Sequence, residues 1–207
     1  RRIIVTSGFL RQCKNPALTA LAGVTLGTQG PIESQRVQWT DQSAEVSVPV
    51  KLAGSLTCTK SKAMVQIDHA GTSVPLLTER RFKRGQLFVL NTHTFSQEDF
   101  DWVGEVLLAP SRLGLLALPQ PVVQILRNVF TQPLAVELQA PTRVTCQSMG
   151  RNQWFIQNFN DAPVDLSFTT PVVSKQGAKE GWSGRSLADT DGRVRTTLGA
   201  RERLWIR

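Results

Sequence analysis

The segment from Arg84 to Phe130 constrains the fold of this chain more than any other. It begins with a turn at Gly85 and a short apolar run, Leu87–Leu90, which is typical of a buried strand. A polar loop follows, and then two helical patterns punctuated by prolines. A strand, a loop and helices in this order make one unit of an α/β layer. We therefore expect the rest of that layer upstream and a separate all-β module downstream.

Both helical patterns carry a start signal and an apolar stripe. Ser96 is a good N-cap, and the helix after it places Phe100, Val103 and Leu107 on one stripe. The second helix starts at Leu118-Pro119. Its residues expected to face inward are Val122, Val123, Leu126 and Phe130.

The N-terminal residues predict a parallel strand. Arg2–Thr6 is an apolar run that ends in Ser7-Gly8, a turn typical of the carboxyl end of such a strand. The run is too short for the apolar region of a signal peptide. Because the chain lacks an initiator Met, we expect it to begin inside a longer gene product.

The next segments predict one helix and several antiparallel strands. Asn15-Pro16 has the residues of a helix start, with Asn as cap and Pro in the first turn. Residues 31–57 alternate polar and apolar side chains, and Pro49 favours an edge position. Ala63–Ile67 and Val74–Thr78 are expected to pair as a hairpin.

After residue 133 the apolar period changes from helical to two-residue. Short strands at regular spacing without helices between them predict a small antiparallel β-sandwich. The expected strands are Ala135–Leu138, Arg143–Gln147, Asn152–Asn158, Val164–Thr169, Arg193–Leu198 and Arg203–Ile206. Ser174–Gly184 is expected to be a mobile loop. The chain is thus predicted to have an α/β domain over 1–132 and a sandwich over 133–207.

The formal net charge is +8, which raises the question of an anionic partner. The densest basic run supplies a candidate polyanion patch of Arg80, Arg81, Lys83 and Arg84. The arginines near the C-terminus are spaced along strands, as on a solvent-exposed face. No zinc finger, helix-turn-helix or RNP motif accompanies the charge, so nucleic-acid binding is not favoured.

Neither a metal site nor a cofactor site is predicted. The three cysteines are far apart and odd in number, which fits neither a disulfide framework nor a zinc site. His69 and His93 lack the spacing of metal ligands. No apolar run reaches the roughly 18 residues of a membrane-spanning helix, so we expect a soluble chain.

No catalytic constellation is predicted. Ser7, His93 and Asp99 can be drawn as the triad of a small hydrolase, but the G-x-S-x-G elbow is absent. Carboxylates crowd around Asp99, where the helix dipole at a first turn already favours them. His93 remains a candidate ligand contact because it follows a strand of the α/β layer.

The tryptophans divide by context. Trp154 and Trp205 lie in strand patterns and are expected in the sandwich core. Trp182 lies in the glycine-containing loop and is the candidate for an exposed aromatic that binds sugar.

Two stretches resemble the non-catalytic C-terminal region of multidomain bacterial β-galactosidase-like glycoside hydrolases. RRIIVTSGFLR (Arg1–Arg11) and RGQLFVLNTHTFSQEDF (Arg84–Phe100) are similar to an amidotransferase-like, flavodoxin-like α/β domain. RNQWFIQNFNDAPVDLSF (Arg151–Phe168) is similar to a hairpin of the sandwich that follows it. The amidotransferase G-x-C-x-G elbow is missing here, so the resemblance implies a degenerate, non-catalytic domain.

The resemblance also implies a function. It predicts a structural, oligomerisation and accessory region of a carbohydrate-active enzyme, with no catalytic residue of its own. The expected partners are a catalytic (β/α)8 barrel of the same parent protein and a second copy of the chain. A stand-alone carbohydrate- or polyanion-binding module and a small Ser/His hydrolase remain as alternatives.

Overall fold

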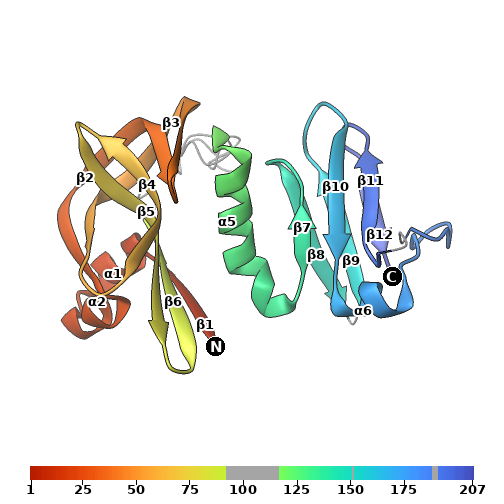
Figure 1. Ribbon diagram of the computed structural model, residues 1–207, viewed down its shortest axis with the longest axis horizontal. Coiled ribbons are helices and arrows are strands. Elements are labelled where there is room, and N and C mark those ends of the chain that lie inside the picture. Colours follow the sequence, from red (N-terminus) through yellow and green to blue (C-terminus); the bar gives the residue numbers. More distant parts are fainter. Residues whose placement is uncertain (92–116, 151, 188–190) are drawn as a thin grey trace. The chain divides into compact units, whose positions relative to one another are not determined.

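The computed structural model describes most of the chain: residues 1–91, 117–150, 152–187 and 191–207. The chain divides into two units, Arg1–Val122 and Val123–Arg207 (Figure 1). The division falls within the helix α5 (Gln120–Thr131), whereas the sequence suggested a boundary after residue 132. Assignment of residues 1–132 to an amidotransferase-like domain stays a prediction.

The first unit contains a six-stranded mixed sheet with the order β1-β6-β5-β4-β2-β3. Among its described residues the elements are β1 (Arg2–Thr6), α1 (Ser7–Cys13), α2 (Pro16–Ala22), β2 (Val24–Trp39), β3 (Gln42–Cys58), β4 (Lys62–His69), β5 (Thr72–Phe82) and β6 (Gly85–Leu90). β1 and β6 pair in parallel, and the other neighbouring strands pair antiparallel. The predicted parallel strand, the hairpin and the antiparallel strands are therefore confirmed.

The start and the end of α2 follow from local sequence. The Oδ1 atom of Asn15 accepts a hydrogen bond from the N–H of Ala17 at 3.0 Å, and Pro16 fills the first helical position. The helix ends at Gly23, whose φ of 70° is the left-handed conformation that glycine adopts at low cost. The expected edge position of Pro49 is also confirmed, because β3 is the last strand of the sheet.

The helices of the first unit pack against one face of its sheet. Their shared cluster of buried side chains comprises Leu10, Ala22, Val24, Leu56, Leu87 and Val89. Leu87 and Val89 alternate along β6, which brings both side chains to the same face. Burial of these apolar side chains is the main favourable term that holds α1 and α2 in place.

The second unit contains two three-stranded antiparallel sheets, with the orders β11-β10-β7 and β12-β9-β8. Its described elements after α5 are a 3₁₀ helix (Gln132–Leu134), β7 (Glu137–Gln139), β8 (Val144–Gly150), β9 (Gln153–Asn158), β10 (Val164–Thr169), α6 (Pro171–Gln176), β11 (Val194–Leu198) and β12 (Arg203–Ile206). One apolar cluster, which includes Ile156, Phe168, Val194 and Ile206, joins side chains from both sheets. All six predicted strands are found, and they form two antiparallel sheets around this cluster.

Two predictions about the backbone of the second unit are wrong. Residues 151–168 do not form a hairpin, because β9 and β10 belong to different sheets and the chain crosses between them. The segment expected to be a mobile loop begins inside α6, and Lys179 and Glu180 then form β-bridges with Ser186 and Ile206. Backbone hydrogen bonds thus order the part of this segment that the structure describes.

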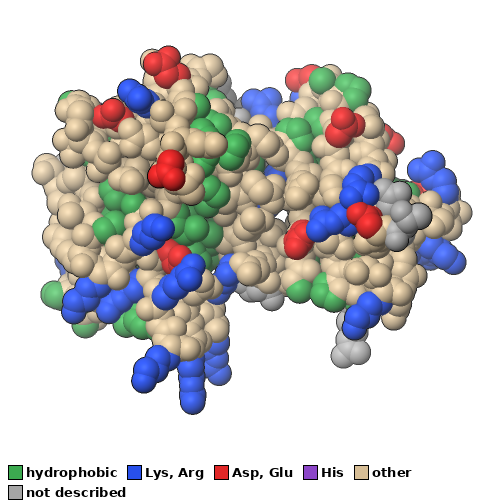
Figure 2. Space-filling view, in the orientation of Figure 1, with side chains coloured by type: hydrophobic (Ala, Val, Ile, Leu, Met, Phe, Trp, Pro, Cys, Tyr) green, Lys and Arg blue, Asp and Glu red, His purple; other side chains and the backbone are tan. Residues whose placement is uncertain are grey.

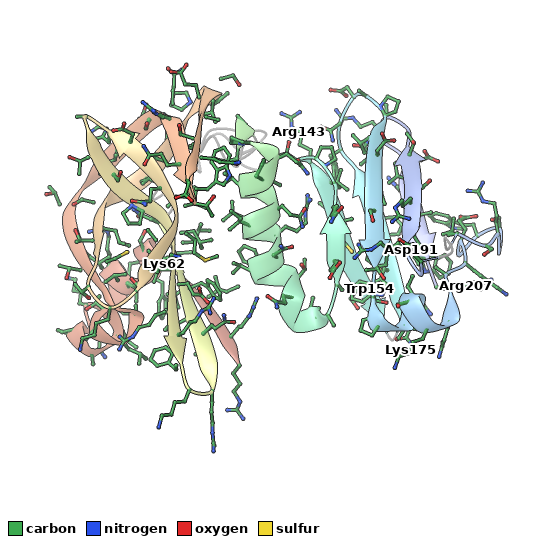
Figure 3. All side chains as sticks on the ribbon, viewed as in Figure 1. Lys62, Arg143, Trp154, Lys175, Asp191 and Arg207 are labelled. Carbon is green, nitrogen blue, oxygen red and sulfur yellow. The ribbon has the colours of Figure 1, made fainter. Side chains whose placement is uncertain are left out.

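Two aromatic side chains that were expected to face the core face outward instead. Trp205 is half-buried on the outer face of its sheet, since Leu204 and Ile206 point into the core and side chains alternate along a strand. Phe130 of α5 is 50% exposed, and Val129 is buried instead. Trp154 (Figure 3), Val122 and Val123 are confirmed in buried or core-packed positions.

Candidate functional site

The carboxyl end of β1, where the hydrolase alternative requires a nucleophile, holds a buried serine. Ser7 is the first residue of α1 and is 0% exposed, and its Oγ atom has no hydrogen-bond partner among the residues that the structure describes. A substrate carbonyl has no access to a side chain in this position. His93 and Asp99, the other members of the triad, lie outside the described residues, as does the helix expected after Ser96.

Asn91 comes directly after β6, the strand that pairs with β1, and is also 0% exposed. Its Nδ2 atom donates to the carbonyl oxygens of Gly54 at 3.0 Å and Pro75 at 3.1 Å. Its backbone N–H donates to the carbonyl of Leu76 at 2.8 Å. The Asn91 side chain therefore ties the carboxyl end of β6 to β3 and β5.

A second buried asparagine has the same role in the second unit. Asn158, at the end of β9, is 0% exposed and donates from Nδ2 to the carbonyls of Ala162 at 2.9 Å and Gly199 at 2.8 Å. Its Oδ1 atom accepts from the backbone N–H of Asn160 at 2.8 Å. The side chain thus fixes the crossing from β9 to β10 against the turn before β12. Sequence reasoning singled out neither asparagine, although both lie in the segments that carry the resemblance.

The basic run lies on the hairpin formed by β5 and β6, and Figure 2 shows Lys and Arg side chains gathered at that end of the first unit. Two members, Arg80 and Arg81, have partners within the first unit. Arg80 donates to the carbonyls of Ala20 and Leu21, and its guanidinium lies 5.0 Å from the ring centre of Phe82. Lys83 and Arg84 form the exposed turn. The polyanion patch stays a prediction.

Glu79, which the sequence did not single out, lies between the basic side chains of this hairpin. It is 8% exposed and accepts from Arg81 Nε at 2.8 Å and Gln86 Nε2 at 2.6 Å. The hydrogen bond and charge of Glu79 raise the pKa of Arg81 above its usual value. A buried carboxylate paired in this way holds the Arg81 guanidinium in place.

Trp182 belongs to a cluster of three aromatic rings on the outer face of the sheet β12-β9-β8. The ring centroids of Trp182 and Trp205 are 5.9 Å apart at an interplanar angle of 75°. Phe155 makes a second edge-on contact with Trp182 at 6.2 Å and 79°. Trp182 is nevertheless 60% exposed, so its exposure is confirmed and its proposed contact with sugar stays a prediction.

The second unit also has a polar pocket of about 660 Å³ beside α5, β7 and α6, which the sequence did not reveal. Its charged side chains are Glu137, Asp191 and Arg193 (Figure 3 labels Asp191). Arg193 and Glu137 form an ion pair at 2.5 Å, and Asp191 pairs with Arg195 at 2.5 Å. The charges here therefore neutralise each other. Arg195 lies on the exposed face of β11 as predicted, whereas Arg193 precedes the strand and is half-buried in the pocket lining.

Neither a metal cluster nor a membrane-spanning helix is found in the ranges that the structure describes. No three His, Cys, Asp or Glu side chains gather there in a way that could hold an ion. None of the described helices is both long and apolar enough to cross a bilayer.

The sequence matches no protein-family model. It matches no curated protein either. Solved structures similar to the chain include Gan42B, a GH42 β-galactosidase from G. stearothermophilus, at 12% identity and a TM-score of 0.41. The β-galactosidases from Rahnella sp. R3 (14%, TM-score 0.41) and from the haloarchaeon Halorubrum lacusprofundi (13%, TM-score 0.39) are similar to the same degree.

These alignments cover most of this chain and a small part of the other proteins. They span 93%, 100% and 93% of this chain, but 24%, 28% and 24% of the Gan42B, Rahnella and Halorubrum chains. The chain thus spans about a quarter of the length of these β-galactosidases. A likeness of this extent does not make it a member of their family.

Proposed function

We propose that this chain is a non-catalytic accessory region of a glycoside hydrolase of the β-galactosidase kind. The catalytic (β/α)8 barrel lies elsewhere in the parent protein. The first unit, together with α5, is a degenerate amidotransferase-like α/β domain, and the second is the sandwich that follows it. Their role is structural: they pack against the barrel and support assembly of the enzyme into oligomers.

One observation carries this proposal. Each of the two segments that resemble the glycoside hydrolase region contains a fully buried asparagine, Asn91 in the first and Asn158 in the second. Both asparagines direct their amide groups at backbone carbonyls of distant segments. Buried amides whose donors bond to the backbone specify a fold. The resemblance therefore rests on residues that build structure.

The burial of Ser7 supports the same conclusion. In an α/β layer, ligands bind beyond the carboxyl ends of the parallel strands. Here Ser7, directly after β1, is 0% exposed. The last residue of β1, Thr6, pairs with Leu90 of β6, and the buried Asn91 follows Leu90. A nucleophile must reach its substrate, so the Ser/His hydrolase is the weaker alternative.

A comparison of activities tests the proposal. The isolated chain and the native gene product are each assayed with chromogenic β-galactosides and with a chromogenic ester. We expect β-galactosidase activity in the native product and no hydrolysis of either substrate by the isolated chain. Ester hydrolysis that disappears in the variant Ser7→Ala would establish the hydrolase instead.

A further inference from the structure

Trp182 is an exposed ring held in a fixed orientation. The Gly181 N–H donates to the carbonyl of Trp205 at 2.7 Å, and the Gly184 N–H donates to the carbonyl of Glu180 at 2.8 Å. The Glu180 carboxylate accepts the N–H of Ser183 at 3.0 Å. A turn closed by these bonds presents the indole in one position, which lowers the conformational entropy lost when a ligand binds.

Packing below the turn fixes the ring further. A Cβ atom on Gly181 would lie 2.1 Å from the Trp205 ring, so glycine is what allows the turn to lie directly on that indole. Phe155 and Trp205 are cross-strand partners, and Trp182 meets both rings edge-on. We call these three rings the aromatic platform.

The size of the platform selects the class of ligand. A stable protein interface buries about 800 Å² on each partner, with an apolar core. A whole aromatic side chain offers only about 150–250 Å². Trp182 is the one ring of the platform with most of its surface open, so the platform suits a single ring-sized ligand rather than a protein surface.

The polar side chains beside Phe155 on β8 and β9 are amides. Gln153 and Gln157 flank Phe155 at two-residue spacing on β9, which places them on the same face, and Gln147 is the cross-strand partner of Phe155 on β8. An amide both donates and accepts hydrogen bonds, as hydroxyl groups require. None of the residues of β8, β9 and β12 is acidic, and Arg203 is their only base.

We propose that this face binds a neutral saccharide, with the C–H face of one sugar ring stacked on Trp182 and its hydroxyl groups bonded by the glutamine amides. An open aromatic ring beside amides that donate and accept matches the two surfaces of a pyranose. The proposal extends the proposed function: the accessory region would also hold carbohydrate near the enzyme.

Affinity electrophoresis tests this with the full chain and soluble polymers as probes: the neutral β-1,4-galactan, xylan and mannan, and the acidic polygalacturonate. We expect at least one neutral polymer to retard the chain, and the variant Trp182→Ala to weaken the interaction about tenfold or more. Leu134→Ala is the matched control, because Leu134 is also 60% exposed but lies in the 3₁₀ helix and not on β8, β9 or β12. It should bind as the unaltered chain does.

Three outcomes would overturn the inference: no neutral polymer retards the chain, only polygalacturonate does, or Trp182→Ala binds as well as Leu134→Ala. Circular dichroism of both variants verifies that the exposed substitutions leave the fold intact. Because binding is measured on this chain alone, the result is independent of whether the native product hydrolyses galactosides. The inference and the proposed function can therefore fail separately.

Discussion

Asn158 donates an amide hydrogen to the carbonyl oxygen of Gly199, 41 residues away along the chain, at 2.8 Å. The same nitrogen donates to Ala162 on the crossing between the two sheets of the sandwich. One side chain therefore holds two turns of the second unit together. Its value lies in pairing its own buried donor with part-buried carbonyls of two turns.

Asn158→Ala should lower the free energy of unfolding of the second unit by about 3 kcal/mol, because the hydrogen bonds of a fully buried side chain are lost and a cavity forms. Amide hydrogen exchange along β9, β10 and β11 measures this change within that unit. Asn158→Asp should be at least as damaging at neutral pH, since a carboxylate oxygen would face the Ala162 and Gly199 carbonyls. The control Gln147→Ala, at an exposed position, should leave exchange unchanged; equal protection in all variants would contradict the role of Asn158.

Asn91→Ala should destabilise the first unit by about 2–3 kcal/mol, because the carbonyls of Gly54 and Pro75 lose their donor. The increase in amide exchange should be concentrated in β3, β5 and β6, the strands that Asn91 joins. Gln35→Ala, at an exposed position of β2, is the control. Exchange that stays at the level of the control would show that Asn91 does not tie these strands together.

The cysteines should differ in reactivity although all three are free. Burial raises the pKa of Cys146 to about 12, with the Arg127 charge opposing part of the shift. Cys13 is exposed. At neutral pH, iodoacetamide should modify Cys146 at least about a thousandfold more slowly than Cys13, because the thiolate is the reactive form. Peptide mass mapping over time measures both rates, and comparable rates in the folded chain would contradict the burial of Cys146.

The turn that carries Trp182 should loosen in acid. The hydrogen bond from Ser183 lowers the pKa of Glu180 below its usual value. A carboxylate with a lowered pKa stabilises the folded state fully above its unfolded pKa, and this contribution is lost as the pH falls through the lowered value. The indole N–H resonance of Trp182 should therefore shift with pH in that acid range. In Glu180→Gln the shift should be absent; an identical titration in that variant would assign it to another group.

The local parts of the fold could be predicted from the sequence because their signals lie within a few residues. Asn15-Pro16 and Gly23 predict both ends of α2, and alternation predicts the strands of the sandwich. The Arg203–Ile206 pattern could also have predicted that Trp205 faces outward. Leu204 and Ile206 face the core, and the residue between them lies on the opposite face.

The long-range parts could not be predicted from one sequence. Which sheet β10 joins depends on pairings with β7 and β11, and no local residue distinguishes a crossing from a hairpin. The aromatic platform unites residues from β9, β12 and the turn near Gly181, and the contacts of Asn158 reach 41 positions along the chain. Trp182 alone could be singled out, since glycines and charged residues around an aromatic side chain indicate exposure.

The measurement that tests the central claim most directly is the intact mass of the native gene product, taken by mass spectrometry on protein from its own source. An accessory region of a glycoside hydrolase requires a species far heavier than 22.9 kDa, with β-galactosidase activity in the same purified material. A native product of 22.9 kDa, or a heavier one that cleaves no glycoside, would contradict the proposed function.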